Sequence, residues 1–134
     1  MYNLDNEKAK QLTVGGIIFA LPCELGKPKL TAEILTFRVK AIGRRYITLA
    51  RKTEAGFSDK DEKYDIGFGI SEEQVRSGMK SGRLLFFKSK ADVSLFIESE
   101  RLKLKVWGFL DNSLNRSDLT NVQIRQMANI LGIT

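Results

Sequence analysis

The fold is decided by EILTFRVK (Glu33–Lys40) and RRYITLARK (Arg44–Lys52), two neighbouring stretches in a chain of 134 residues. Each alternates apolar with polar side chains and is rich in β-branched and aromatic residues, a pattern typical of a half-buried strand. Only three residues, AIG (41–43), lie between them. The pattern therefore predicts an antiparallel hairpin.

The alternation of the two strands also selects the length of their loop, because both strands must bury the same face. A two-residue loop mixes polar and apolar side chains on each face. A three-residue loop instead places Phe37 opposite Ile47 on the buried face and Arg38 opposite Tyr46 on the other. Gly43 then falls where such a loop needs a positive φ. The expected outward side chains are Arg38, Lys40, Arg44, Tyr46 and Thr48.

Positive charge is concentrated in the same part of the chain. The sequence has 22 Lys and Arg against 16 Asp and Glu, a net charge of +6. Residues 1–57 carry a net +5 and residues 58–134 a net +1. Between Lys27 and Lys52, eight basic side chains face one acidic residue, Glu33. A local positive field of this kind attracts nucleic acid or an acidic protein surface.

Other signals in the first half are shorter. A helical turn at Asn6–Leu12 is expected to fray, since it lies at a terminus. A strand is expected within 14–21, ended by Pro22, with a turn at 26–28. The charged stretch Glu54–Asp65 (EAGFSDKDEKYD) is typical of a loop, and Tyr64–Ile70 is a weak candidate for a further strand.

The second half contains helix signals. Ser71 and Gln74 have capping-box spacing, so a short helix is expected to begin there and to end near Gly78 or Gly82. Arg83–Phe87 then indicates a strand or the approach to a helix. From Ser89 onward, apolar residues follow a helical stripe, although 101–105 also alternates as a strand would.

The last expected helix is the best specified. Thr120 and Gln123 form a capping box, Leu119 is placed to staple onto Ile124, and Gly132 supplies the stop. A loop over Asp111–Arg116 is expected to precede it. The whole pattern predicts a single α+β domain over 1–134: a polar segment (1–12), a small twisted β-sheet or partly closed barrel (13–70), and a mainly helical part (71–134) with two or three short helices.

Composition excludes several kinds of chemistry. The chain has no histidine and one cysteine, Cys23, so the commonest metal ligand and the Ser-His-Asp and Cys-His catalytic groups are missing. The longest apolar run, 15–22, is too short to cross a bilayer, and the polar start does not resemble a signal peptide. We therefore expect a cytoplasmic protein without membrane contact, metal or cofactor, and not an enzyme.

Several side chains allow two interpretations. The acidic residues within 59–65 lack the glycine of a calcium loop, so they are expected to be solvated or to neutralise part of the basic face. Paired carboxylates such as Glu72 with Glu73, or Glu98 with Glu100, are the remaining catalytic option. Cys23 is expected to be a small buried hydrophobe. Trp107, Phe109 and Leu110 form either an exposed docking patch or, as the helical stripe favours for Trp107, part of the core.

The hairpin FRVKAIGRRYI (37–47) and the closing helix LTNVQIRQMANILG (119–132) carry a resemblance. Together they cover about a quarter of the chain, which resembles small, mostly uncharacterised bacteriophage proteins with an N-terminal β-barrel and a helical tail. The hairpin is also similar to those of SH3-like barrels in ribosomal and transcription-elongation proteins, which bind RNA or protein. The resemblance implies a phage origin, and hence the host cytoplasm, but no shared enzymatic activity.

These observations favour a non-enzymatic, basic binding protein that contacts nucleic acid, or a host complex that handles nucleic acid. A row of cations can follow phosphates, and Tyr46 beside Arg38 can stack on an unpaired base. One alternative is a stoichiometric inhibitor of a host enzyme or antiviral defence complex, and another is a virion assembly subunit. Solvation and edge protection of a sheet would also explain the cations. The candidate binding residues are Arg38, Lys40, Arg44, Arg45, Tyr46 and Arg51.

Overall fold

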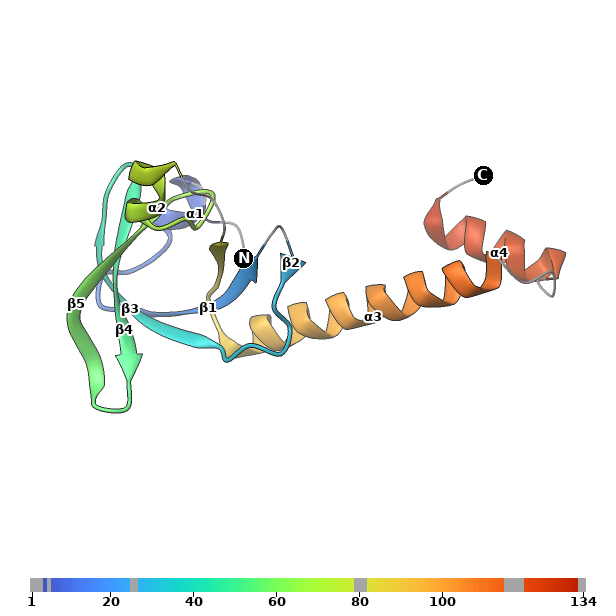
Figure 1. Cartoon of the computed structure of the whole chain (residues 1–134), viewed down its shortest axis with the longest axis horizontal. Coiled ribbons are helices and arrows are strands. Elements are labelled where there is room, and N and C mark those ends of the chain that lie inside the picture. The colour runs from blue at the N-terminus through green and yellow to red at the C-terminus, as the bar shows by residue number, and fades with distance from the viewer. Residues whose placement is uncertain (1–3, 5, 25–26, 79–81, 115–119, 133–134) are drawn as a thin grey trace. The chain divides into compact units, whose positions relative to one another are not determined.

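A computed structural model describes residues 4, 6–24, 27–78, 82–114 and 120–132. It confirms the α+β class: the described strands form one sheet, accompanied by helices (Figure 1). None of the described helices is both long and apolar enough to cross a membrane. The elements are α1 (Asn6–Lys10), β1 (Ile17–Glu24), β2 (Lys27–Pro28), β3 (Leu35–Ile42), β4 (Tyr46–Thr53), β5 (Gly56–Asp65), α2 (Glu72–Ser77), β6 (Gly82–Phe87), α3 (Lys90–Leu114) and α4 (Asn121–Leu131).

The sheet is antiparallel and has β1 near its middle. Its order is β2-β1-β3-β4-β5, and β6 pairs with β1 along the edge opposite β3. In the described part of the chain β5 and β6 form no ladder with each other, so the sheet stays open rather than closing into a barrel. The expected end of the first strand at Pro22 is wrong: β1 continues to Glu24. Pro22 is in register with Leu84 of β6, but its carbonyl accepts from the Lys29 N–H, so its nitrogen faces the other edge of β1, where the β1–β3 pairing has stopped at Ala20 and no bond to β6 is lost.

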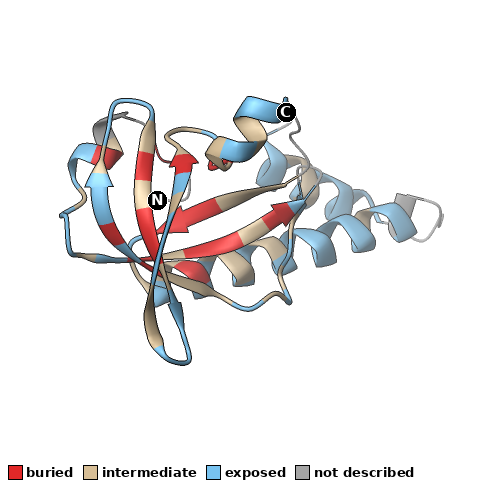
Figure 2. Ribbon diagram, turned by 60° about the vertical axis from the view of Figure 1, so that its left-hand side comes forward, coloured by how far each residue is buried: buried red, intermediate tan, exposed pale blue. Residues whose placement is uncertain are grey.

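Apolar side chains form two cores, one on each side of β1 and β6. The buried positions along the strands are red in Figure 2. The first core contains Phe37, Ile47 and Leu49, each 0% exposed, together with residues of β1, β5 and β6. The second lies over β1 and β6, where the start of α3 contributes Val93. Because β1 and β6 are covered on both sides, they contain long apolar runs, whereas β3 and β4 alternate.

The hairpin faces are as expected, but its register is not. Phe37 pairs with Arg51 and Val39 with Leu49, rather than Phe37 with Ile47. A β-bulge between Val39 and Ala41 adds a residue to β3, so the three-residue loop moves to positions 43–45. Gly43 therefore does not adopt a positive φ. Alternation fixes which side chains are buried, but a bulge shifts the pairing without changing that pattern.

The expected loop at Glu54–Asp65 is wrong, because most of it is β5. A tight turn at Thr53–Gly56 joins β4 to β5, and Thr53 donates its hydroxyl to the Gly56 carbonyl. The weak strand at 64–70 is also wrong: Tyr64 and Asp65 end β5, and a turn follows. Charged side chains on a strand at the sheet edge oppose pairing with another chain. The polarity that suggests a loop thus belongs to an edge strand.

The helix starts are largely confirmed. Ser71 caps α2 by accepting from the Gln74 backbone, and Gly78 ends it in the left-handed region. Ser89 accepts from the Asp92 backbone at the start of α3. Thr120 and Gln123 form both bonds of the capping box of α4, and Gly132 is its left-handed C-cap. The expected staple through Leu119 lies outside the described residues.

Further expectations concern the N-terminus and α3. In α1 Ala9 is 2% exposed, as is Leu4 before it, and Leu4 packs in the first core. The strand alternative at 101–105 is excluded, since α3 runs through it. The loop expected over Asp111–Arg116 is wrong for residues 111–114, because α3 continues to Leu114. Residues 115 and 116 lie outside the described part of the chain. The chain forms two compact units, Met1–Ile97 and Glu98–Thr134.

Candidate nucleic-acid interface

One side of β3, β4 and β5 carries most of the polar side chains of the sheet. We call it the outer face. Cross-strand pairs place Arg38 beside Ala50, Lys52 beside Phe57, and Tyr46 beside Asp65. These positions alternate with the buried residues of the first core, so they point away from it. The outer face consists of Arg38, Lys40, Tyr46, Thr48, Ala50, Lys52, Phe57, Asp61, Lys63 and Asp65, with Arg44 and Arg45 in the adjoining loop.

Two arginines on this face stack on aromatic rings. The guanidinium of Arg38 lies 4.1 Å from the centroid of the Phe57 ring, reaching across β4. The guanidinium of Arg45 lies 5.3 Å from the centroid of the Tyr46 ring. Such contacts hold the flat guanidinium groups in place while leaving their N–H groups available to a ligand. Phe57 is not among the sequence candidates, because its charged segment is typical of a loop.

Carboxylates of β5 neutralise part of the positive charge, as the alternative interpretation of the acidic segment expected. Lys40 Nζ lies 2.6 Å from Asp61 Oδ1, and Arg45 Nε lies 3.7 Å from Asp65 Oδ2. Lys40 and Asp61 are both about half exposed, so their pairing contributes little to stability and can yield to a competing phosphate. These pairs reduce the positive electrostatic field of the outer face without cancelling it.

Other cations keep their charge uncompensated. Arg44, Lys52 and Lys63 are exposed, and no ion pair to them is found among the described residues. With Arg38, Lys40 and Arg45, the outer face and its loop carry six cations against two carboxylates, Asp61 and Asp65. The face is therefore positive by about four charges. An extended anionic ligand would gain from this field at low ionic strength.

Arg51 lies on the opposite side of the sheet from the other five candidates. Its guanidinium donates to both carboxylate oxygens of Glu62, at 3.0 and 2.9 Å, and sits 5.3 Å from the buried Phe37 ring. Burial lowers the pKa of Arg51, but attraction to Glu62 and the hydrogen bonds outweigh it, so the pKa is raised. Arg51 thus closes the rim of the first core and is not part of the outer face.

Tyr64 joins Arg51 and Glu62 in a partly buried, hydrogen-bonded cluster. Its hydroxyl donates to Glu62 Oε1 at 2.8 Å and accepts from Arg51 at 3.3 Å. Burial, followed by the hydrogen bond to Glu62, raises the pKa of Tyr64 to about 12. The protonated hydroxyl is favoured in the folded state because the phenolate would be desolvated beside a carboxylate.

The Tyr64 shift predicts a specific loss of stability in alkali. The ordinary tyrosine pKa near 10 is raised on folding, so this stabilisation is complete below about pH 10 and is lost as the pH rises through about 12. The free energy of unfolding of the wild type should therefore fall by about 2 kcal/mol relative to that of Tyr64→Phe across this range. Urea unfolding of both proteins at several pH values measures it. A constant difference would contradict the raised pKa.

The carboxylate pairs considered for catalysis have other partners. Glu72 accepts from Arg76 at 2.7 Å on α2, and Glu100 accepts from Lys103 at 3.0 Å on α3. No group of three or more potential metal ligands is found among the described residues. Cys23 is 2% exposed and packs in the second core, which confirms it as a buried hydrophobe.

The prediction that Trp107 belongs to the core is wrong. Trp107 is 68% exposed and Phe109 is 56% exposed, on the second half of α3. The helical stripe is real: Val93 and Phe96 near the start of α3 pack in the second core. The second core includes only the start of this helix, however, and the stripe continues into its second half, where Trp107 and Phe109 are exposed.

No protein-family model, curated protein or solved structure matches this chain. The resemblance to bacteriophage barrel proteins and to SH3-like barrels therefore stays a prediction. Any assignment of function has to come from the chemistry of the side chains described above.

Proposed function

We propose that this protein is a non-enzymatic binding protein that holds single-stranded nucleic acid on the outer face of β3, β4 and β5. The observation that carries the proposal is the presence of two arginine–aromatic stacks, Arg38 on Phe57 and Arg45 on Tyr46, within a face of net positive charge. Proteins that bind single strands combine a cationic path for the phosphates with flat groups on which bases stack. We place this activity in the cytoplasm, of the host cell if the protein is phage-encoded.

Each part of the outer face has a distinct role in this proposal. Arg44, Lys52 and Lys63 contact phosphates by charge. The Arg38 guanidinium and the Tyr46 ring present flat surfaces to unpaired bases, since arginine planes as well as aromatic rings stack on bases. Lys40 exchanges its contact with Asp61 for a phosphate. The remaining carboxylates limit affinity, so binding should be weak at physiological salt.

Fluorescence anisotropy of labelled oligonucleotides tests this proposal. A single strand of about ten nucleotides should bind with a logarithmic salt slope of about −2 to −3, as expected for three to four phosphate contacts. A duplex of the same sequence should bind more weakly, because its bases are not free to stack. Absence of saturable binding at low salt, or equal affinity for the duplex, would contradict the proposal.

The alternative partner is an acidic or nucleic-acid-handling host protein, bound by the same outer face. Capture from a host extract with and without nuclease separates the two. Nucleic acid lost on nuclease treatment, with no protein left behind, supports direct binding. A single protein retained in equal amounts after nuclease treatment would favour the inhibitor and contradict the proposal above.

A further inference from the structure

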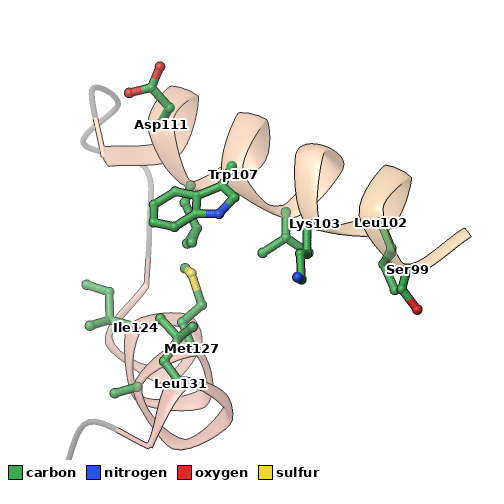
Figure 3. A pocket seen from close by; sticks show the side chains of 11 residues that line it. Ser99, Leu102, Lys103, Trp107, Asp111, Ile124, Met127 and Leu131 are labelled. Atoms are coloured by element: carbon green, nitrogen blue, oxygen red, sulfur yellow. The ribbon is translucent and has the colours of Figure 1, made fainter. Parts of the chain in front are cut away.

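The second half of α3 and α4 face one another across an apolar groove of about 830 Å³ (Figure 3). On α4 the lining residues Ile124, Met127, Ala128 and Leu131 recur at helical spacing and form one stripe. On α3, Trp107 points toward this stripe from the opposite wall. The remaining lining side chains from α3 are Ser99, Leu102, Lys103, Val106, Leu110 and Asp111.

Many of the side chains that line this groove are largely exposed to solvent. Trp107 is 68% exposed, Leu102 61% and Leu131 53%, although all three line the groove. Within the described part of residues 98–134 these two helices are the only elements, and domains bury such apolar stripes between packed layers. The caps of α4 are nonetheless fully formed by Thr120, Gln123 and Gly132. The pair of helices α3 and α4 thus has well-formed caps on α4 and an apolar side whose lining residues are largely exposed.

The apolar area matches what a dimer interface needs. Aromatic side chains bury roughly 150 to 250 Å² each when fully covered, and aliphatic ones lie near or below the lower end of that range. Six residues in and beside the groove are 44% to 68% exposed, which leaves on the order of 700 Å². A standard interface takes about 800 Å² from each partner. The six residues are Leu102, Val106, Trp107, Phe109, Ile124 and Leu131.

The charge of this part of the chain also permits a second copy. Residues 98–134 contain five basic and four acidic side chains, a net charge of +1, whereas residues 1–97 carry the other +5. Both signs occur along α3, with Glu98 and Glu100 followed by Arg101, Lys103 and Lys105. A two-fold arrangement brings each patch against its own equivalent, so a near-neutral surface of mixed sign avoids the repulsion that a basic surface would meet.

We infer that two copies of this chain associate through the α3–α4 groove, each pair of helices covering the groove of the other. Helices commonly pack in this way around apolar stripes. The dimer carries two outer faces, and joining two weak sites raises the apparent affinity for a long strand. That last consequence rests on the proposed function, whereas the dimer itself does not.

The single tryptophan of the chain, Trp107, reports directly on this interface. Analytical ultracentrifugation of the full chain should show a reversible monomer–dimer equilibrium. The Trp107 emission should be blue-shifted and protected from acrylamide at high concentration, and should shift to the red on dilution. Ile124→Glu should raise the dissociation constant at least about 100-fold, because it buries an unpaired carboxylate in the groove. Val122→Glu, on the same helix but outside the groove lining, should leave dimerisation intact.

Leu102→Glu repeats the test from α3, whose first turns are held by the second core. Circular dichroism should show that both groove variants keep their helix content. A monomer with exposed Trp107 at all concentrations would overturn the dimer, as would a monomer whose Trp107 is protected regardless of concentration, which would mean that the chain covers its own groove. A trimer or larger assembly would also contradict it. If the wild-type protein forms the dimer but does not bind oligonucleotides, the proposed function is overturned and the dimer is not.

Discussion

Replacing Arg38 and Arg44 together by glutamate should lower the affinity for a single-stranded oligonucleotide at least about 100-fold at low salt. The double substitution changes the charge of the outer face from about +4 to about neutral. It also removes the guanidinium that stacks on Phe57 at 4.1 Å. Fluorescence anisotropy measures the loss, and the salt slope should become shallower by about 0.7 for each phosphate contact that disappears.

The matched control is the pair Lys27→Glu and Lys88→Glu. Both lysines are exposed and lie outside the outer face, so the net charge changes by the same amount. This control should retain most of the affinity. Equal losses in the two double variants would show that only net charge matters, and would contradict a binding site on β3, β4 and β5. Thermal unfolding checks that all variants remain folded.

Substituting Gly69 by alanine should destabilise the fold by about 3 kcal/mol or more. Gly69 has φ +70° in the turn between β5 and α2. A Cβ atom there would collide with the backbone carbonyl oxygen of Leu84 on β6. The contact cannot open easily, because the Leu84 N–H donates to the Gly69 carbonyl at 2.9 Å and the Gly69 N–H donates to Asp65 at 3.1 Å. Urea denaturation measures the free energy of unfolding.

Gly78→Ala separates the collision from the strain of the backbone. Gly78 has nearly the same φ, +73°, but a Cβ atom there meets nothing within 4 Å. Its substitution should cost only about 1 to 2 kcal/mol, the ordinary penalty for an L-residue in the left-handed region. Similar losses at Gly69 and Gly78 would show that the turn does not dock tightly on β6.

The faces of the hairpin were predictable from sequence, whereas its pairing was not. Alternation identified Phe37, Ile47 and Leu49 as buried, and each is 0% exposed. The bulge at Lys40 leaves no trace in the alternation up to that residue, because it lies near the strand end, where Lys40 and Ala41 are both exposed. A register prediction from pattern and loop length alone therefore failed.

The edge strand β5 was missed for a related reason. Its charged residues resemble a solvated loop, and only the cross-strand pairing shows that Asp61 and Glu62 meet basic partners on opposite sides of the sheet. Side-chain pairs between strands are set by tertiary structure and are not visible in a single segment. Because the sequence does not predict β5, it also does not place Phe57 on the outer face. It groups Arg51 with the outer cations, although Arg51 lies on the opposite side of the sheet.

The exposure of Trp107 shows where helical periodicity stops being informative. The stripe from Val93 to Trp107 is continuous in sequence, but the second core covers only its first part. Periodicity identifies the apolar side of a helix, and it does not say whether the cover comes from the same chain. The caps of α4 were predictable because capping depends on neighbouring residues alone.

Heteronuclear NMR of the full chain, titrated with a single strand of about ten nucleotides, tests the binding site most directly. The backbone amide signals of Arg38, Arg44, Tyr46, Lys52 and Phe57 and the guanidinium signals of the two arginines should shift together and saturate at one affinity. Signals of Arg51 and Tyr64, on the other side of the sheet, should stay nearly unchanged. Shifts confined to the helices, or no saturable shifts at low salt, would contradict a nucleic-acid site on the outer face.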